Sequence, residues 1–420
     1  MTDLSVYIEH LTKEARQASF AMSIASSEAK SFALNAIAAR LDASRDQLKS
    51  ANAKDLERSS DAGLEQALID RLKLDDIAID QMVEGIAQVD RLADPIGEIT
   101  DLSFRPSGIQ VGRMRVPLGT IGIIYESRPN VTADAAALCI KSGNSCILRG
   151  GSEAIESNRE ISKAITGALK ETDLPNTAVQ LVDTVDREAV GQLLKADEDI
   201  DIIIPRGGKG LIERITRESS IPVIKHLDGV CHVYIDESAE IKMAIEIALN
   251  SKASKYAVCN AAETLLVDSC MASDVLPMLG QEYKKIGVEI RGCKQVAELI
   301  SDITLAIDED WHEEYLGPVI AIKVVDGLAE AIEHINAYGS HHTDTIVTNN
   351  YENSRQFLKA VDSATVMVNA STQFADGFEF GLGAEIGIST DKLHARGPVG
   401  LEGLTTQKYV VFGHGEVRHR

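Results

Sequence analysis

Short apolar runs alternate with longer segments of helical periodicity between residues 121 and 219. The runs read "IGIIYE", "SCILRG", "VQLVD" and "IDIIIP", and a helical segment follows each of them. A strand that is covered on both faces is apolar at nearly every position, because the connecting helices shield both sides from water. Strands and helices that alternate in this way are typical of a parallel sheet. This stretch therefore predicts an α/β domain.

A second series of apolar runs begins near residue 232 and continues to about residue 370. Its members read "HVYID", "ETLLVD", "VEIRG", "PVIAIKVV", "DTIVT" and "TVMVNA". A chain of 420 residues is too long for one ordinary hydrophobic core. No repeat of fixed period is visible along it. We therefore expect a second α/β domain after the first.

The remaining segments predict a helical N-terminus and a separate pair of strands. Residues up to about 94 have helical periodicity, whereas alternation and Gly/Pro punctuation begin at 102. The segments near 102–117 and in the C-terminal tail are predicted to form edge strands, whose unpaired backbone groups need a partner. The predicted domains are 1–101 with 118–227, then 228–385, and oligomerisation strands at 102–117 with 402–420.

Charge and composition exclude several classes of protein. The formal net charge of −22 argues against a protein that grips nucleic acid or an anionic membrane through its overall field. No apolar run reaches 18 residues, and the acidic N-terminus does not resemble a secretory signal. The six cysteines form no CxxC pair and no metal-ligand spacing. We therefore expect a reduced, cytoplasmic protein without structural disulfides or zinc.

Two glycine-rich turns follow strands of the first domain. They read "RGGSE" (149–153) and "PRGGKG" (205–210). Exposed N–H groups at a helix N-terminus bind phosphate, and glycine allows a close approach to the backbone. Neither turn matches a GxGxxG or P-loop pattern, so each is also explained as an ordinary helix cap. Their occurrence on successive strands favours a dinucleotide site.

Cys259 lies at a junction rather than inside an apolar run, in "KYAVCNAAETLLV". The order and spacing of "KHLDGVCHVYID", that segment and "EEYLGPVIAI" resemble the aldehyde dehydrogenase superfamily. The closer resemblance is to its γ-glutamyl phosphate reductase family, in five segments between about 121 and 411. These segments read "GIIYESRPNVT", "LRGGSEA", "CNAAETLLV", "NASTQFADGFEFGLGAEIGIST" and "LHARGPVGLEGLTTQKYVV".

The resemblance implies an aldehyde-dehydrogenase-like fold, with a Rossmann-like cofactor domain, an α/β catalytic domain and a small β element for oligomerisation. It implies NADPH-dependent reduction of L-glutamyl 5-phosphate to L-glutamate 5-semialdehyde in proline biosynthesis. It also implies a homodimer or homotetramer, and glutamate 5-kinase is a candidate partner. Two alternatives stay open: a coenzyme A-dependent acylating aldehyde dehydrogenase, and a catalytically silent binding protein on the same fold.

Within this resemblance Cys259 is the nucleophile that forms a thioacyl enzyme. Its thiolate would be favoured by donors or cations such as Lys252 or Lys255, which lie close in sequence. The N–H of Cys259 and the side chain of Asn130 are candidate donors to the oxyanion. Asn130 is equally well explained as the N-cap of a helix.

His226 marks a departure from the superfamily. In the hydrolytic members an "ELGG" glutamate activates the water that deacylates the enzyme, whereas this chain reads "HLDG". Loss of that carboxylate would protect a thioester until hydride arrives, and it therefore favours an acyl-phosphate reductase. His226 itself is either an acid–base group or a packed residue at the end of a strand.

The resemblance also names candidate binding residues. Arg149 and Ser152 stand where relatives bind the adenosine ribose, and a serine beside an arginine accommodates a 2′-phosphate, which favours NADP. The other cofactor candidates are Gly207, Gly208, Lys209 and, at the nicotinamide ribose, Glu314. The candidates for the substrate anions are Arg128, Lys255, His394 and Arg396. The loop 383–400, which carries His394 and Arg396, lines the substrate entrance or is an ordinary surface loop.

Overall fold

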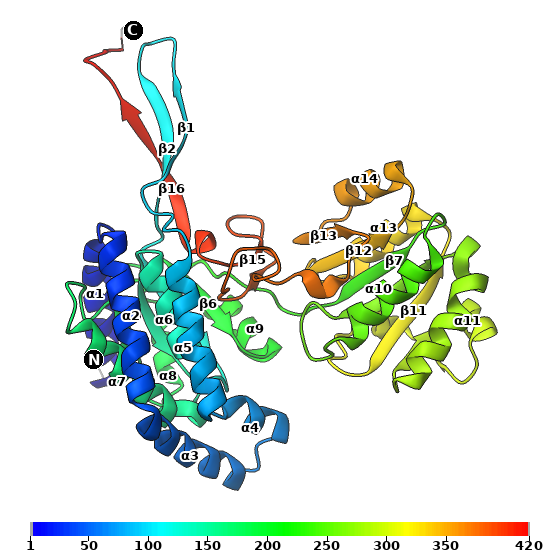
Figure 1. Ribbon diagram of the computed structural model, residues 1–420, viewed down its shortest axis with the longest axis horizontal. Helices are drawn as coiled ribbons and strands as arrows, with labels where there is room; N and C mark the ends of the chain where they lie inside the picture. The colour runs from blue at the N-terminus through cyan, green and yellow to red at the C-terminus, as the bar shows by residue number, and fades with distance from the viewer. Residues whose placement is uncertain (1–2, 419–420) are drawn as a thin grey trace. The chain divides into compact units, whose positions relative to one another are not determined.

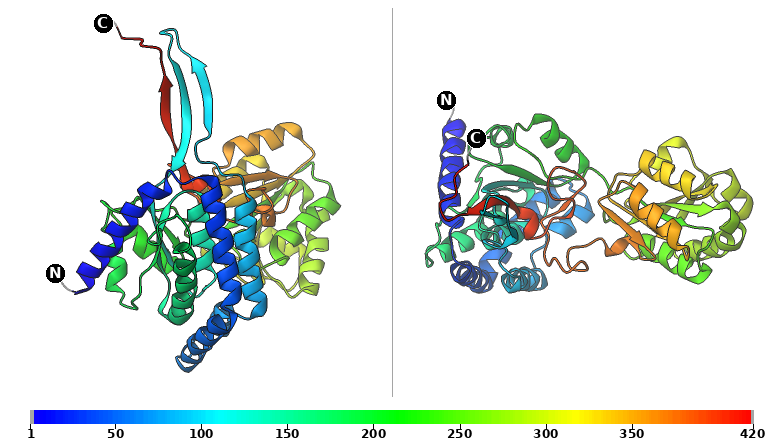
Figure 2. Two further views of the ribbon diagram at one scale, coloured as in Figure 1. Left: turned by 60° about the vertical axis from the view of Figure 1, so that its left-hand side comes forward. Right: turned by 90° about the horizontal axis from the view of Figure 1, so that it is seen from above.

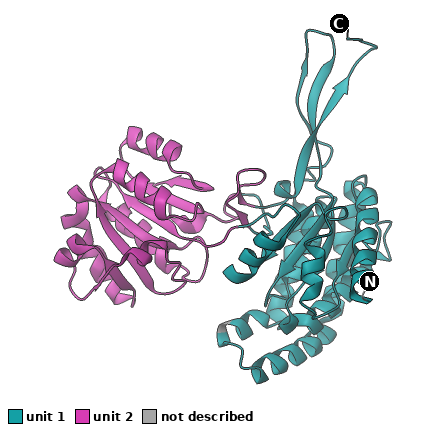
Figure 3. Cartoon of the chain, turned by 180° about the vertical axis from the view of Figure 1, so that it is seen from behind, with its two compact units in different colours: residues 1–225, 381–387, 399–420 teal, residues 226–380, 388–398 magenta. Residues whose placement is uncertain are grey.

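The computed structural model describes residues 3–418 and separates into two compact units (Figure 3). Unit 1 contains the chain up to Lys225, Gly381–Gly387 and the chain from Val399 onward, and unit 2 contains His226–Phe380 and Ile388–Pro398. Residues 381–385, which we assigned to the second domain, group with unit 1. Their position follows from contacts there: a Cβ at Gly383 would lie 2.9 Å from the side chain of Leu92.

Helices form the N-terminal part of unit 1, as the periodicity predicts (Figure 1). Ser26 and Asp75 cap α2 and α5, because their side chains accept the backbone N–H groups of Ala29 and Ala78. Each helix buries residues three or four positions apart. The five helices are α1 (Asp3–Met22), α2 (Ser27–Ala43), α3 (Arg45–Asp61), α4 (Gln66–Leu72) and α5 (Asp76–Arg91).

A four-stranded parallel sheet in the order β5-β4-β3-β6 forms the centre of unit 1. The chain adds β4 and β5 on one side of β3 and then β6 on the other side, so the order reverses between β3 and β6. Ligands of open parallel sheets bind beside such a reversal, at the carboxyl ends of the strands. The elements are β3 (Thr120–Tyr125), α6 (Val131–Lys141), β4 (Ser145–Arg149), η1 (Ser152–Ala154), α7 (Ile155–Leu169), β5 (Val179–Leu181), α8 (Glu188–Leu193), β6 (Ile202–Arg206) and α9 (Lys209–Glu218).

A three-stranded antiparallel sheet forms an arm that extends from the rest of unit 1 (Figures 1 and 2). It consists of β1 (Ile99–Phe104), β2 (Gln110–Pro117) and β16 (Thr405–Phe412), which follows η4 (Glu402–Leu404). The register runs from Thr405 opposite Pro117 to Phe412 opposite Gln110. The two segments predicted as separate strands are therefore neighbours in one sheet, although residues 419–420 of the predicted tail lie outside the described part.

Unit 2 contains a seven-stranded parallel sheet in the order β10-β9-β11-β8-β7-β12-β13. Its elements up to β10 are β7 (Cys231–Ile235), α10 (Ile241–Ala253), β8 (Ala262–Asp268), α11 (Ser269–Lys285), β9 (Glu289–Gly292), α12 (Lys294–Leu299) and β10 (Thr304–Leu305). The later elements are η2 (Asp308–His312), β11 (Val319–Val325), α13 (Leu328–Tyr338), β12 (Thr343–Val347), α14 (Tyr351–Ala360), β13 (Thr365–Val368), η3 (Thr372–Phe374), β14 (Ile388–Ser389) and β15 (Gly397–Pro398).

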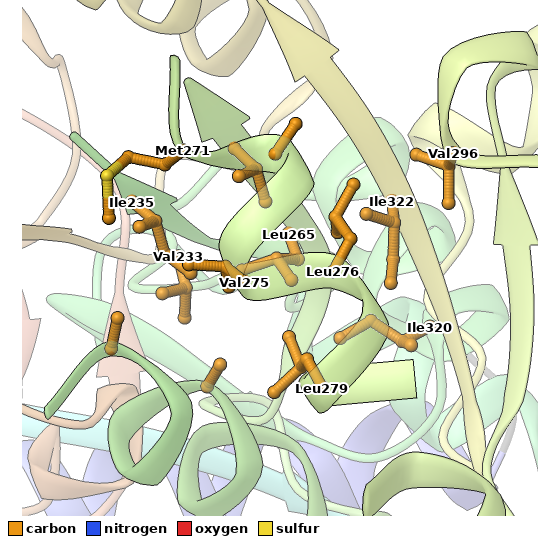
Figure 4. Close-up of a cluster of buried hydrophobic side chains, with 14 of the residues drawn as sticks. Val233, Ile235, Leu265, Met271, Val275, Leu276, Leu279, Val296, Ile320 and Ile322 are labelled. Carbon is orange, nitrogen blue, oxygen red and sulfur yellow. The ribbon is translucent and has the colours of Figure 1, made fainter. Parts of the chain in front are cut away.

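One hydrophobic cluster of unit 2 lies between its sheet and the helices α10 and α11 (Figure 4), and a second one includes Ile335 of α13 and Phe357 of α14. Strand residues such as Val233 and Leu265 pack in the first cluster against Val275 and Leu279 of α11. Every residue of β7, β8 and β12 is buried, as the continuous apolar runs predict for strands covered on both faces. None of the helices described is long and apolar enough to cross a membrane.

Candidate active site

Cys259 lies in a turn between α10 and β8 and is half-buried. Hydrogen bonds fix this turn from both sides: Asn260 Nδ2 donates to the carbonyl oxygen of Gln373, at 3.2 Å, and Gln373 Nε2 donates to that of Lys255, at 3.1 Å. The residue is therefore not part of a strand or helix core. A thiol on a fixed turn at the edge of a sheet is the arrangement that a nucleophile requires.

The amino ends of neighbouring parallel strands bring other groups to Cys259. Cys259 precedes β8, Gly229 precedes β7 and His342 precedes β12, and these three strands are adjacent in the order β8-β7-β12. A Cβ on Gly229 would lie 2.0 Å from the carbonyl oxygen of Cys259. Only glycine allows this approach, which explains why "HLDG" ends in glycine. The thiol of Cys231 also donates to that carbonyl oxygen, at 3.2 Å.

Two imidazoles lie beside the thiol. A ring nitrogen of His226, a ring nitrogen of His342 and Sγ of Cys259 all lie within 4.8 Å of one another. The two rings meet edge to face with centroids 5.4 Å apart. Nδ1 of His226 lies 3.1 Å from the carbonyl oxygen of Ile388. Since a carbonyl can only accept, Nδ1 of His226 is the donor in this contact.

His342 is the residue of this cluster that the sequence did not single out. It is fully buried, and its Nε2 has no hydrogen-bond partner within residues 3–418. Burial lowers the pKa of His342 to about 3, and the neighbouring His226 lowers it further. The ring is therefore neutral at pH 7. Nothing in "GSHHTD" distinguishes it, because its contact with Cys259 depends on the strand order.

Glu314, predicted to bind the nicotinamide ribose, lies in the same part of unit 2. Its Oε1 accepts the backbone N–H of Gly229 at 2.9 Å, and Gly229 in turn lies against Cys259. Glu314 precedes β11, which is the neighbour of β8 on the other side from β7. The amino edge of four adjacent strands thus holds the thiol, the two imidazoles and this carboxylate.

A buried ion pair supports this edge. Lys252 Nζ and Glu263 Oε2 are in contact, and both side chains are fully buried. Glu263 Oε1 also accepts the N–H of Leu316 at 3.4 Å, which ties the Glu314 loop to β8. Burial lowers the pKa of Lys252 and raises that of Glu263 to about 7. The Lys252 ammonium contacts Glu263 in the interior, whereas Lys255 is exposed.

Two substrate candidates lie on the β14–β15 segment. The hydrogen bond from His226 to Ile388 joins this segment to the Cys259 cluster. His394 is exposed on it, and Arg396 Nη2 donates to Oδ1 of Asp362 at 2.9 Å. An arginine that is already paired with a carboxylate must exchange partners before it binds a substrate anion. The roles of both residues stay predictions.

In unit 1 the predicted phosphate turn lies at the start of α9. Gly207, Gly208 and Lys209 are exposed there, directly after β6. The N–H of Gly208 donates to Oε2 of Glu126, which follows β3, at 3.0 Å. The turn therefore lies beside the reversal of strand order between β3 and β6. A phosphate at this helix N-terminus would displace the carboxylate of Glu126, because both compete for the same N–H.

Arg149 ends β4, and its side chain is largely buried. Nη1 donates to the carbonyl oxygen of Gly150 at 2.6 Å, and Nε has no hydrogen-bond partner within the described residues. Burial lowers the pKa of Arg149, and the guanidinium groups of Arg187 and Arg214 contribute to the same shift. The carboxylate of Glu153 raises the pKa of Arg149 and so opposes this shift. The sequence did not single out Arg187, which directly precedes α8, or Arg214 of α9, because their effect on Arg149 joins separate segments of the chain.

The other candidates of unit 1 are exposed. Ser152 begins η1, and the carboxylate of the following Glu153 accepts the N–H of Ser127 at 2.6 Å. Asn130 stands at the start of α6, but its side chain makes no capping hydrogen bond and instead donates to Oδ2 of Asp134 at 2.9 Å. Asn130 therefore occupies the N-cap position of α6 without the side-chain hydrogen bond of a cap. Its role as an oxyanion donor, and that of Arg128 in substrate binding, stay predictions.

The chain belongs to the aldehyde dehydrogenase family, which matches residues 5–297 and 304–395. It is similar to a γ-glutamyl phosphate reductase from Thermotoga maritima, with 45% identity over 98% of this chain and 100% of that one, and a TM-score of 0.96. A γ-glutamyl phosphate reductase from Saccharomyces cerevisiae is 33% identical over 98% and 99% of the two chains, with a TM-score of 0.55.

An acetylating aldehyde dehydrogenase from Geobacillus thermoglucosidasius shares the fold, at 18% identity over 100% of both chains and a TM-score of 0.67. The predicted resemblance and the predicted fold class are therefore confirmed.

Proposed function

We propose that this chain is an oxidoreductase that reduces L-glutamyl 5-phosphate to L-glutamate 5-semialdehyde and phosphate, a step of proline biosynthesis. The similarity to two γ-glutamyl phosphate reductases supports this reaction. The single observation that carries it is the imidazole of His226 beside Cys259, where hydrolytic relatives have a water-activating carboxylate. A site without that carboxylate keeps a thioester intact until it is reduced.

The experiment that tests this function follows the reverse reaction. Purified protein is mixed with glutamate 5-semialdehyde and NADP, and reduced cofactor is measured by absorbance with phosphate, with coenzyme A or with neither. Phosphate-dependent formation of the reduced cofactor is expected. Dependence on coenzyme A would identify an acylating aldehyde dehydrogenase instead, and no turnover under any condition would indicate a silent binding protein.

In the proposed reaction Sγ of Cys259 attacks the acyl carbon, a C–S bond forms, and the C–O bond to phosphate breaks with its electron pair leaving on phosphate. The thiol must first lose its proton. His342 is too weak a base for this, because its pKa is about 3. We assign the proton to Nε2 of His226, whose Nδ1 is held by Ile388. The N–H of Cys259 and Asn130 are the proposed donors to the oxyanion.

The residues at the carboxyl ends of β3, β4 and β6 fit a nicotinamide dinucleotide, as the family implies. Gly207 and Gly208 expose their backbone at the start of α9, with Lys209 next to them, and the Nε of Arg149 lacks a partner among the described residues. When bound, the cofactor supplies the hydride that reduces the thioester. Glu314, which fixes the loop beside Cys259, is the proposed ligand of the nicotinamide ribose.

We predict a preference for NADP(H) over NAD(H) of at least about tenfold in catalytic efficiency, roughly 1.4 kcal/mol of differential binding. The reason is the positive charge of Arg149 close to Ser152 in the "RGGSE" turn, since a 2′-phosphate is held by such groups. Arg149→Ala is expected to remove most of the preference, measured as kcat/KM for both cofactors. Arg217→Ala, an exposed position on α9, is the control. An unchanged preference in Arg149→Ala would contradict this assignment.

We also predict that His226→Glu converts the enzyme to phosphate-independent oxidation of the semialdehyde. A carboxylate at this position lies close enough to Cys259 to activate water against the thioester. The measurement compares formation of NADPH without phosphate in the wild type and the variant, and formation of glutamate confirms hydrolysis. His226→Gln matches the size of glutamate without its charge and should gain no such activity. A folded His226→Glu variant that still requires phosphate would rule out this placement of His226.

The remaining assignments concern substrate and assembly. Arg128, Lys255, His394 and Arg396 are the proposed partners of the two substrate anions. Apolar side chains of the arm, including Phe104 and Val411, are exposed at 72% and 58%, which supports pairing with a second copy of the chain. Sedimentation of the purified chain would test a homodimer or homotetramer. A cytoplasmic location and a complex with glutamate 5-kinase belong to the same proposal.

A further inference from the structure

The three side chains that meet at Cys259 are of the types that zinc prefers. Thiolate sulfur and imidazole nitrogen are its usual protein ligands, and three protein ligands with one open position are typical of sites that keep room for water or another small ligand. His226, Cys259 and His342 place one such atom each within 4.8 Å of one another. We propose that these three residues bind a zinc ion, which would block the nucleophile reversibly.

The spacing requires only small movements. With zinc bonds of about 2.3 Å to sulfur and 2.0–2.1 Å to nitrogen, tetrahedral ligand atoms lie roughly 3.4–3.6 Å apart. The three ligand atoms lie at most 4.8 Å apart in the structure, so zinc binding requires them to move closer by little more than about 1 Å. Cys259 and His226 are half-buried and lie outside helices and strands, so side-chain rotation can supply that shift.

A backbone contact orients one of the two rings, and the other presents a buried nitrogen. Nδ1 of His226 lies 3.1 Å from the carbonyl oxygen of Ile388, which fixes the orientation of that ring. His342 Nε2 is a buried nitrogen without a hydrogen-bond partner among residues 3–418, while its Nδ1 lies 2.9 Å from Oγ1 of Thr343. A buried polar atom without a partner is costly, and a metal at this position would satisfy it.

The backbone around the thiol is already fixed. Gly229 and Cys231 both contact the carbonyl oxygen of Cys259, and Asn260 is bonded to Gln373. Preorganised ligands lose little conformational freedom when the ion binds. Sequence spacing does not reveal this site, because its members are held together by the order of β8, β7 and β12 rather than by a local motif.

The test measures binding directly and does not depend on turnover. Zn²⁺ is titrated into the full-length reduced protein by calorimetry, and Co²⁺ is titrated as a coloured substitute, since cobalt–thiolate complexes absorb in the near ultraviolet. We expect one ion for each chain and a thiolate band with Co²⁺. Inhibition by Zn²⁺ should be reversed fully by a chelator, because no covalent bond within the protein changes.

Variants identify the ligands. Cys259→Ser should abolish the thiolate band, and His342→Gln and His226→Gln should each raise Kd at least about tenfold, the effect of losing a group that holds or orients a metal. His334→Gln is a matched control, because His334 is also buried in unit 2 with an unpartnered Nε2 within the described residues. Circular dichroism confirms that each variant is folded.

The proposal is overturned if the wild type binds no Zn²⁺ at concentrations up to about 1 mM. A Kd of that size corresponds to a binding free energy of only about −4 kcal/mol. The proposal is also overturned if the thiolate band survives in Cys259→Ser, or if both histidine variants fold and keep the affinity of the wild type. Because binding is measured without substrate, failure of the proposed reaction would leave these results interpretable.

Discussion

Cys259→Ser is expected to reduce turnover by at least about a thousandfold, roughly 4 kcal/mol of transition-state stabilisation. A serine hydroxyl is far less ionised than a thiol at neutral pH and forms no thioester. The half-buried turn accepts serine with little change in volume, so the fold should survive. Steady-state assays of the semialdehyde with NADP and phosphate measure the loss.

Cys270→Ser is the matched control for this experiment. Cys270 is an exposed cysteine of unit 2 at the start of α11, outside the cluster that holds Cys259. Its replacement should leave kcat/KM unchanged. Activity of Cys259→Ser within about tenfold of the wild type would refute the nucleophile assignment, because the reaction would then proceed without the Cys259 thiol.

Lys252→Met is expected to cost about 3–5 kcal/mol of unfolding free energy, the usual effect of removing one partner from a buried ion pair. Glu263 would remain fully buried without its counter-charge, and burial already raises its pKa to about 7. The Leu316 N–H that Glu263 accepts joins the pair to the Glu314 loop, so we also expect a loss of activity. Urea unfolding followed by fluorescence measures the stability, because the only tryptophan, Trp311, is buried in unit 2.

Two further variants separate the cost of an unpaired charge from the value of the pair. The double variant Lys252→Met with Glu263→Gln has no buried charge and should recover much of the lost stability. Lys284→Met breaks an exposed pair with Asp302 and should change the midpoint far less. If Lys252→Met unfolds at the wild-type urea concentration, the pair does not stabilise unit 2.

The fold class could be predicted from the sequence because its signal is local. Runs such as "IGIIYE" and "ETLLVD" are apolar at successive positions, and only strands that are covered on both faces have that pattern. The structure contains these runs as β3 and β8, both fully buried. The helical N-terminus was predictable for the same reason, since residues three and four apart share one face of a helix.

The sequence was less informative wherever a contact joins distant segments. Residues 381–385 fall within the predicted second domain but group with unit 1, where Gly383 lies against the distant Leu92. Arg149 was singled out by resemblance, whereas the electrostatic effect of Arg187 and Arg214 on it comes from later segments of the chain.

The sequence by itself therefore determined two α/β units, the junction that presents Cys259 and the replacement of a glutamate by His226. The tertiary structure alone decided what surrounds the thiol. His226, Cys259 and His342 precede three different strands, and they meet because β7 lies between β8 and β12. Lys252 and Glu263 likewise form a buried pair that neither residue type predicts. Periodicity reports which face of a strand or helix is covered, but the order of strands in a sheet depends on packing across the whole unit.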